Sequence, residues 1–313
     1  MTLTSMTYFV VLARERSFTK AAEQLHITQQ SLSSHISSLE RELGCKLLIR
    51  RVPLELTYAG KVFLRYASYF QQNISTMRQE FCDISGNQKG VLRIGVAFTR
   101  GRAIMPELID IFQQKYPSIS IELAEAANET LHKNLLNGEV DLAIANFPHA
   151  LQGIALEYFY REEVVLLVSK KLIDDLYSGN AKQVLSDVRS GNLSVLADCP
   201  VVMGDSADIA ARIGLASIHE ANIQPPIKAK SDNIETLLAL CLRGVGACFC
   251  PENLARATLS DAQMETLNLI RLGKKGKYQI RFGYLKQSYQ WSIISEFITT
   301  ALGSLKRDDI INR

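Results

Sequence analysis

The chain has 313 residues, of which 47% are hydrophobic and 21% are charged, and its formal net charge is +3. This composition is ordinary for a folded globular protein, and the length allows two or three structural units. No apolar run reaches the roughly 18 residues that a membrane-spanning helix needs. The N-terminal residues Met1–Thr7 lack a basic stretch followed by an apolar core. We therefore expect a cytoplasmic protein without a secretory signal and without a membrane span.

The positive charge is concentrated at the start of the chain. Residues 1–86 contain 10 Lys or Arg and 7 Asp or Glu, whereas residues 87–313 contain 25 of each kind. A basic excess at one end of an otherwise neutral chain fits a nucleic-acid-binding head on a neutral body. The cysteines are scattered, and we expect them to be buried thiols. They are Cys45, Cys82, Cys199, Cys241, Cys248 and Cys250.

Three helices are predicted within the first 44 residues. The first covers residues 4–14, and either Ser17 or Thr19 can cap a second, short helix over residues 20–25. After a three-residue turn, Thr28 can cap a third helix over residues 29–43, which Gly44 would end in the left-handed conformation. The expected inward residues are Met6, Phe9, Val10 and Ala13 of the first helix and Leu32, Ile36, Leu39 and Leu43 of the third. Two helices joined by such a turn form a helix-turn-helix, whose second helix lies in the DNA major groove.

The outward face of the third helix is polar. Gln and Ser side chains both donate and accept hydrogen bonds, so they suit base edges and phosphates. By composition alone, a solvated helix face is the alternative. The candidate DNA contacts on this face are Gln29, Gln30, Ser33, Ser34, His35 and Ser37.

The same region resembles the DNA-binding head of the LysR family, in order and without gaps. The matching residues are Phe9, Val11, Ser17 to Leu25, Thr28 to Ser33, Ile36, Leu39, Glu40, Leu43, Gly44, Leu47, Arg50 and Leu56 to Gly60. Two positions depart from the family pattern, because Gln30 stands where proline is usual and Leu48 where phenylalanine is usual. Neither change removes a group that could bind DNA. The two departures therefore affect which operator sequence is recognised, not whether the head binds DNA.

The resemblance implies a wing over residues 45–57. Arg50 and Arg51 would lie near its tip and contact phosphates or enter the minor groove. An exposed basic pair without a DNA contact is the alternative. We also count Ser17, Thr19 and Thr28 among the DNA-binding residues.

A long helix is predicted after Gly60, reaching to about residue 84 without an internal proline or glycine. Apolar residues recur every seven positions, which is typical of a helix that pairs with another helix. A lone amphipathic helix packed on its own domain is the alternative. The resemblance also implies a dimer through this linker, and two heads related by a two-fold axis predict a partly palindromic operator. The dimerisation candidates are Phe63, Tyr66, Phe70, Ile74, Met77 and Phe81.

In the rest of the chain, predicted strands and helices alternate. A first βαβαβ unit covers residues 92–145 and a second one residues 201–250, so we expect parallel sheets with helices on both faces. The order resembles the two-lobed, periplasmic-binding-protein-like effector domain of LysR proteins. Its anchors are Tyr116-Pro117, residues 137–144, residues 231–236 and residues 244–246.

The predicted fold class is therefore mixed: an all-α winged helix-turn-helix head, a long linker helix and a two-lobed α/β domain. We expect the head at residues 1–58, the linker and hinge at 59–89, and the effector-binding domain at 90–313. Lobe 1 would comprise about residues 90–162 and 267–313, and lobe 2 about residues 163–266.

Ligands of open α/β sheets bind beyond the carboxyl ends of the strands, where helix N-termini offer free N–H groups. Arg100 and Arg102 point to an anionic effector such as a carboxylate, or are simply exposed. Asp205 instead suits an amine or a hydroxyl. The effector-binding candidates are Thr99, Arg100, Arg102, Asn128, Phe147, Met203, Gly204, Asp205 and Phe249. We expect a small-molecule co-inducer, no other cofactor and no metal.

Three other functional classes fit the sequence less well. An enzyme is disfavoured because the chain has no Ser-His-Asp order, no glycine-rich phosphate loop and no metal triad. A cytoplasmic solute-binding protein would not need the head. A thiol-based redox sensor is the stronger alternative, but Cys199 has no close partner in sequence, and Cys248 and Cys250 alternate along a strand.

The resemblance further implies how such a protein would act. Two dimers would associate through their α/β bodies into a homotetramer, and an effector between the lobes would change the spacing of the heads and the bend of double-stranded DNA. RNA polymerase is a further candidate partner.

Overall fold

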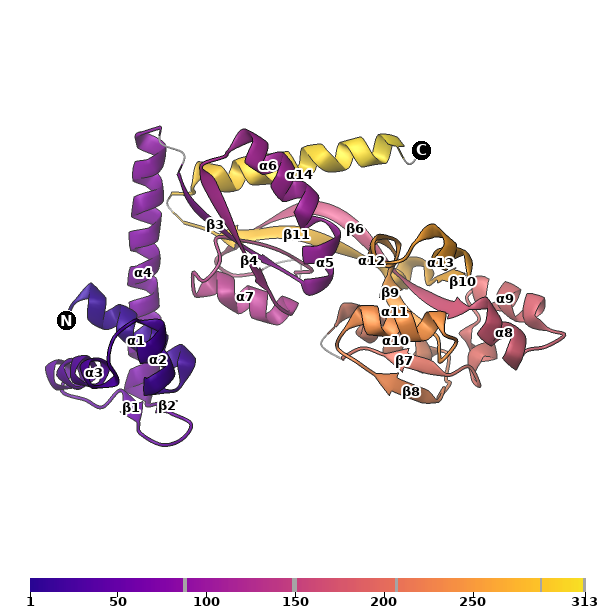
Figure 1. Ribbon diagram of the computed structural model, residues 1–313, viewed down its shortest axis with the longest axis horizontal. Coiled ribbons are helices and arrows are strands. Elements are labelled where there is room, and N and C mark those ends of the chain that lie inside the picture. Colours follow the sequence, from indigo (N-terminus) through magenta and orange to yellow (C-terminus); the bar gives the residue numbers. More distant parts are fainter. Residues whose placement is uncertain (87–88, 148–150, 206–207, 288, 312–313) are drawn as a thin grey trace.

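The computed structural model describes residues 1–313 except 87–88, 148–150, 206–207, 288 and 312–313 (Figure 1). The side chains of Thr99 and of residues 305–311 are also outside the description. None of the helices in the described part of the chain is long and apolar enough to cross a membrane.

The head consists of three helices and a short β-hairpin. The helices are α1 (Leu3–Glu15), α2 (Phe18–Gln24) and α3 (Gln29–Leu43), and the hairpin joins β1 (Leu48–Ile49) to β2 (Glu55–Leu56). Local chemistry sets the helix ends. Ser17, rather than Thr19, caps α2, because its hydroxyl accepts from the Lys20 N–H at 3.4 Å. Thr28 caps α3 at 3.1 Å from the Ser31 N–H, and Gly44 ends it with φ +69°.

The core of the head differs from the predicted stripes at a few positions. Met6, Phe9, Leu32, Ile36 and Leu39 are buried as expected. Leu12 is fully buried, whereas Val10 and Ala13 are only half-buried, so the inner face of α1 is rotated relative to the prediction. Leu43 lies in the last turn of α3, beyond the packed part of the helix, and is 39% exposed.

The linker helix α4 (Tyr58–Ile84) rises from the head as one uninterrupted helix (Figure 1). Thr57 caps it, accepting from the Gly60 N–H at 2.9 Å. Gly60 is required by close packing, because a Cβ there would lie 2.1 Å from the Leu47 carbonyl oxygen. The heptad spacing placed Phe63 in the exposed dimerisation stripe, and this assignment is wrong. Phe63 is buried in the head, with its ring edge-on to Phe9 at 5.0 Å.

Lobe 1 is built on a mixed sheet. Strand β3 (Gly90–Val96) is parallel to β4 (Ile119–Glu125) and to β5 (Leu142–Ala145), as the βαβαβ order predicted. Strand β11 (Lys277–Leu285) pairs with β5 in the antiparallel direction. The expectation of an all-parallel sheet is therefore wrong on this side of β5. Helices α6 (Met105–Lys115), α7 (Asn128–Leu136) and α14 (Ser292–Ile311) cover the sheet, and α14 packs beside α6 (Figure 1).

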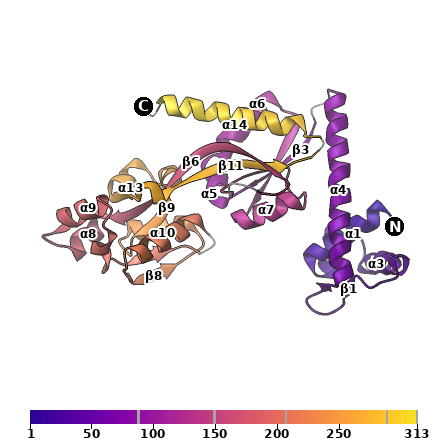
Figure 2. The ribbon, with the colours of Figure 1, turned by 180° about the vertical axis from the view of Figure 1, so that it is seen from behind.

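Two crossing strands connect the lobes. Strand β6 (Ile154–Ser169) pairs with β11 along its first half and with β10 (Leu267–Arg271) and β9 (Cys248–Pro251) along its second half. Figure 2 shows β6 and β11 running side by side from lobe 1 toward lobe 2, which lies farthest from the head. The two lobes therefore share one curved, continuous sheet.

Lobe 2 contains the second predicted unit. Strands β7 (Val201–Met203) and β8 (Ile227–Lys230) are parallel, and a bridge from Val201 to Ala247 connects β7 to the chain before β9. The helices of this lobe are α8 (Lys170–Leu176), α9 (Ala181–Arg189), α10 (Ile209–Glu220), α11 (Ile234–Leu242), α12 (Glu252–Thr258) and α13 (Asp261–Glu265), with 3-10 turns η1 (Leu193–Leu196) and η2 (Gly273–Gly276). The predicted fold class is thus confirmed.

All six cysteines are free thiols. Cys199, Cys241, Cys248 and Cys250 are buried in lobe 2, as expected. Cys45 is exposed, because it follows Gly44 in the turn that leaves α3, so the expectation of burial is wrong there.

Candidate functional site

The N-terminal half of α3 presents unburied polar side chains. Gln29, Gln30 and Ser34 are exposed, and Ser33 and Ser37 are half-buried. His35 is exposed but packs edge-on against the ring of Tyr8 at 5.0 Å, which fixes its imidazole on the outer face of the helix. The capping residues Ser17 and Thr28 flank this face, and Thr19 is exposed in the first turn of α2.

Both wing arginines are exposed and both have a partner. The Arg50 Nη2 donates to the Ser37 hydroxyl at 3.2 Å, and its guanidinium carbon lies 5.7 Å from the centre of the Phe18 ring. These contacts hold Arg50 beside α3. Arg51 is 61% exposed and pairs with Glu55 on the opposite strand of the wing. Because exposed ion pairs are weak, a DNA phosphate can compete with Glu55 for the Arg51 guanidinium.

Glu40 fixes the wing to α3, a role that the sequence did not reveal. Its side chain is buried, and Oε1 accepts from the N–H groups of Leu47 at 2.9 Å and Leu48 at 3.3 Å. Oε2 accepts from the Lys46 ammonium at 2.9 Å. Burial by itself would raise the pKa of Glu40, but the hydrogen bonds from Lys46 and the two backbone groups outweigh it and lower the pKa.

Glu40→Ala should destabilise the head by about 1–3 kcal/mol, because it leaves two buried backbone N–H groups without an acceptor. Glu23→Ala, which removes an exposed carboxylate from the neighbouring helix α2, should have little effect. Urea denaturation of the full chain, followed by circular dichroism, compares the two. Equal midpoints for both variants would contradict the assigned role of Glu40.

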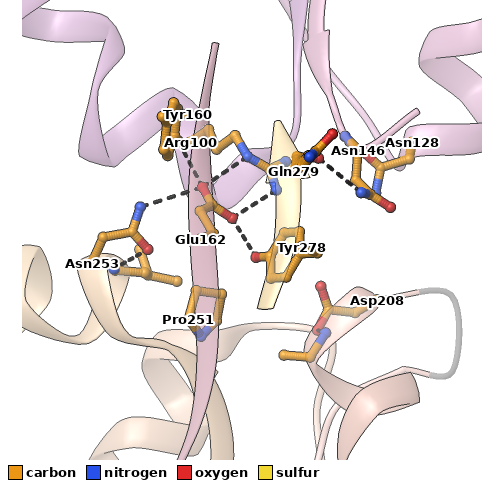
Figure 3. Close-up of polar contacts among 12 residues, drawn as sticks. Arg100, Asn128, Asn146, Tyr160, Glu162, Asp208, Pro251, Asn253, Tyr278 and Gln279 are labelled. Carbon is orange, nitrogen blue, oxygen red and sulfur yellow. Dashed lines mark hydrogen bonds and ion pairs between the residues drawn. The ribbon is translucent and has the colours of Figure 1, made fainter. Parts of the chain in front are cut away.

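Between the lobes lies a buried polar network centred on Glu162 of β6 (Figure 3). Arg100 comes from helix α5 (Phe98–Ala103), and its Nε and Nη2 donate to the two Glu162 oxygens at 3.0 and 2.9 Å. The hydroxyls of Tyr160 and Tyr278 and the amide of Asn253 donate to the same carboxylate, at 2.6 Å for Tyr160 and 3.3 Å for Asn253. The network joins β6, β11 and α12 at the level where the crossing strands leave lobe 1.

The charges in this network neutralise each other. Arg100 is 2% exposed and Glu162 is 4% exposed. Burial favours the neutral carboxyl, but Arg100 and the hydrogen-bond donors outweigh it, so the pKa of Glu162 is lowered. For Arg100, burial by itself would lower the pKa, because it disfavours the charged form, but the charge of Glu162 outweighs burial and raises the pKa. The pair is therefore a fully ionised, bidentate bridge.

This arrangement changes the interpretation of the two arginines after β3. Arg100 is neither exposed nor free to bind an anionic effector, because Glu162 occupies its guanidinium. The segment after β3 is the short helix α5. Arg102 is half-exposed and pairs with Glu235 of α11, so it bridges lobe 1 and lobe 2.

The other effector-binding candidates divide into three groups. Phe147, Met203 and Phe249 are packed in the cores of their lobes, with 3–6% exposure, and Phe249 borders a small cavity of about 20 Å³ inside lobe 2. Asn128 begins α7, and its side-chain oxygen accepts from the Asn146 N–H at 3.1 Å. Gly204 and Asp205 follow β7, and Asp205 is exposed. The Thr99 side chain lies outside the described residues.

Figure 3 also shows polar groups that sequence reasoning missed. The Asn146 amide donates to the Gln279 carbonyl at 2.9 Å, which anchors the end of β5 to β11. From lobe 2, Asp208 caps α10 through the N–H groups of Ala210 and Ala211 at 3.0 and 3.2 Å. The residues that the structure describes contain no group of three or more His, Cys, Asp or Glu that could hold a metal ion.

Comparison with known proteins places both parts of the chain. Residues 3–61 match the family described as bacterial regulatory helix-turn-helix protein, lysR family, and residues 85–306 match the LysR substrate binding domain. A probable RuBisCO transcriptional regulator of Trieres chinensis is 33% identical over 177 residues, which cover 54% of this chain and only 56% of that relative.

Solved structures share the fold over nearly the whole chain. A full-length OxyR of Pseudomonas aeruginosa aligns with a TM-score of 0.70 at 20% identity, covering 96% of this chain and 94% of its own. Full-length CbnR in complex with its target DNA aligns with a TM-score of 0.60 at 21% identity, covering 96% and 99%. The two family matches together span the head and the two-lobed domain. The chain belongs to the LysR family of DNA-binding transcription regulators, with an N-terminal helix-turn-helix and a C-terminal effector-binding domain.

Proposed function

We propose that the head binds a partly palindromic operator through the N-terminal half of α3 and through the wing. The observation that carries the proposal is the unburied polar surface at the start of α3, with Arg50 held beside it. Gln29, Gln30, Ser33, Ser34, His35 and Ser37 would face base edges, and Ser17, Thr19, Thr28, Arg50 and Arg51 would contact the backbone. The DNA complex of CbnR, which has the same fold, supports this use of the head.

The linker helix supports a dimer. Tyr66, Phe70, Met77 and Phe81 are 45–63% exposed on one side of α4, and Ile74 is half-buried next to them. The other side carries polar contacts to lobe 1, including Thr76 to Gln287 at 2.9 Å. An apolar stripe of this length on a helix surface is stabilised by a second copy of the helix. We propose that this second copy is the dimer partner.

Phe70→Glu should convert the dimer to a monomer and weaken operator binding at least about tenfold, because a carboxylate would be buried between two helices and only one half-site would remain bound. Light scattering gives the oligomeric state, and fluorescence anisotropy gives the affinity. Arg78→Gln lowers the charge of the same helix by the same amount at an exposed position and should change neither value. A dimeric Phe70→Glu protein would contradict the proposed interface.

Two exposed sheet edges support association of the α/β bodies into a tetramer. The edge strand β4 carries Glu122 and Glu125, whereas the edge strand β8 carries Lys228 and Lys230. Leu123 and Ile227 on these strands are 40% and 49% exposed. Opposite charges around exposed apolar residues suit antiparallel contacts between two copies.

We propose that a small-molecule effector binds between the lobes and changes how they pack. Two features support this. The crossing strands β6 and β11 connect the lobes, and the exposed Arg102–Glu235 ion pair spans them. An effector shifts the lobes only as far as its affinity differs between the two arrangements. In this proposal the protein acts in the cytoplasm, has no catalytic or metal centre, and divides into head, linker and body near residues 58 and 89.

The buried thiols do not support the redox-sensing alternative. A thiolate is the reactive form of cysteine. Burial raises the pKa of Cys199 to about 12 and raises that of Cys250 as well. The pKa of Cys248 is raised well above its ordinary value by a hydrogen bond with Cys241 and by burial. A redox role would require DNA binding that changes with peroxide and no longer does so after serine replaces these residues.

Hydroxyl-radical footprinting on a fragment that the protein retains tests the proposed DNA geometry. A dimer with two recognition helices should protect two half-sites separated by about one turn of DNA or a multiple of it, roughly 10 base pairs centre to centre. The added effector should change the spacing or the intervening cleavage pattern. A single protected half-site from dimeric protein would contradict the proposed arrangement of the heads.

A further inference from the structure

A cavity of about 540 Å³ lies where the head, the linker helix and lobe 1 meet, away from the space between the lobes. Helix α1 contributes Val10 and Arg14, α4 contributes Leu64 and Ser75, and lobe 1 contributes Arg93 and Trp291. Its volume lies within the range of about 300–1,000 Å³ that is usual for small-molecule sites. The cavity is distinct from the effector site proposed above.

Hydrogen bonds hold the three walls together. Asp83 of α4 accepts from the Ser292 N–H at 2.9 Å, from the Ser292 hydroxyl at 2.7 Å and from the Tyr289 hydroxyl, so the linker caps the N-terminus of α14. Gln79 donates to Asp141 at 3.2 Å. At the other end, the Gln71 amide donates to the Thr7 hydroxyl of α1 at 3.0 Å. These contacts join α4 to lobe 1 at one end of the cavity and to α1 at the other.

The lining combines apolar surface with hydrogen-bond donors. Tyr284 and Trp291 provide aromatic residues, and Arg14 and Arg93 also line the cavity. The Trp291 side chain is 3% exposed, and its indole Nε1 has no acceptor among the described residues.

The acidic groups of the lining are already engaged or exposed. Both oxygens of Asp141 are occupied, one by Gln79 and the other by the Arg93 N–H at 2.9 Å. Glu139 is exposed. The two guanidinium groups make single ion pairs with partly exposed carboxylates, Arg14 with Glu15 at 3.6 Å and Arg93 with Glu122 at 3.2 Å. Their remaining N–H groups suit a carboxylate on a ligand.

We propose that this cavity is a second ligand site, which takes a small molecule with one flat apolar part and one carboxylate. Such a ligand would contact α1, α4 and lobe 1 at once. It would therefore favour the arrangement in which the head is held against the body, and would change DNA binding by a route separate from the lobes. Only this effect on DNA rests on the proposed function; the binding itself does not.

The only tryptophan of the chain lines the cavity, so its indole signal reports directly on this site. Full-length protein labelled with ¹⁵N-tryptophan gives one indole N–H cross-peak, which is followed during titration with phenylacetate and, separately, with its neutral analogue phenylacetamide. We expect saturable movement of the peak with a Kd below about 1 mM for phenylacetate, and binding at least about fivefold weaker for phenylacetamide. Absence of movement with phenylacetate, or equal affinities for the two compounds, would overturn the proposal.

Two variants test whether the movement comes from the cavity. Ser75→Phe fills it from α4 and should abolish the shift, whereas Ser186→Phe places the same side chain on the exposed face of α9 and should leave it unchanged. Arg14→Gln keeps the side-chain volume nearly constant and should weaken phenylacetate binding without affecting phenylacetamide. A shift that survives both Ser75→Phe and Arg14→Gln would place the ligand elsewhere and refute the assignment. Because the readout needs no DNA, it is independent of the operator-binding tests.

Discussion

Glu162→Gln should lower the free energy of unfolding of the effector-binding domain by about 3–5 kcal/mol, because it leaves the buried Arg100 guanidinium without a counter-charge. Glu162 and Arg100 are 4% and 2% exposed, so water cannot solvate the guanidinium that loses its partner. Gln keeps the shape of the side chain, which separates the charge effect from a packing defect. Urea denaturation of the full chain, followed by fluorescence of the lobe 1 tryptophan, measures the change.

An exposed pair in the same lobe provides the control. Glu122→Gln removes the partner of Arg93, where the two side chains are 62% and 42% exposed, and should cost less than about 1 kcal/mol. Equal losses for Glu162→Gln and Glu122→Gln would contradict the assigned importance of burial.

The Glu162 effect should also depend on pH. The pKa of Glu162 in the folded protein lies below its ordinary value of 4.5, so its contribution to stability is present above that value and is lost as the pH falls through the folded-state pKa. The difference between the wild-type chain and Glu162→Gln should therefore shrink in acid. A difference that stays constant down to the acid limit of folding would mean that the carboxylate charge is not its source.

Arg50→Ala should weaken specific and non-specific DNA binding by similar factors and should reduce the slope of log affinity against log salt by about 1, because it removes one phosphate contact. Gln29→Ala should cost about 1–3 kcal/mol on the operator alone, because base contacts carry the sequence information. The structure supports this division. Gln29 is exposed at the start of α3, whereas Arg50 is held beside the helix by Ser37 and Phe18.

Fluorescence anisotropy at several salt concentrations, with operator and random DNA, distinguishes the two effects. Lys182→Ala removes one exposed positive charge from α9 of the body and should leave both affinities unchanged. If Lys182→Ala lowered the salt slope as much as Arg50→Ala, net charge rather than a wing contact would explain the result. If Gln29→Ala and Arg50→Ala behaved alike, the contacts would be misassigned.

Features set by neighbouring residues were predictable from the sequence. The caps at Thr28 and Gly44 depend on local backbone chemistry, and both occur as expected. The order of strands and helices in lobe 2 also matches the prediction, because β7 and β9 are short apolar runs between turn residues. The winged head and the two-lobed body followed from the resemblance to the LysR family.

Features set by distant residues were not predictable. The heptad spacing places Phe63 with Phe70 and Met77, and only the fold shows that Phe9 of the head covers it. Arg100 and Glu162 are 62 residues apart, and no spacing rule connects a residue of α5 to one on a crossing strand. Glu40 and Asp83 are likewise single acidic residues on helices, whose backbone partners become visible only after tertiary packing. From the sequence, charged residues of this kind are expected at the surface, but in the structure they connect elements that are distant in sequence.

The most direct test of the account is a gel-shift titration of the purified protein with the DNA immediately upstream of its own gene and, in parallel, with a pool of genomic fragments. Several salt concentrations and excess competitor DNA separate specific from electrostatic binding. The account predicts that at least one fragment is shifted in more than one step and survives competition, as expected for an oligomeric regulator with paired heads. Binding that prefers no fragment, or no binding at low salt, would contradict the claim that the head reads a DNA sequence.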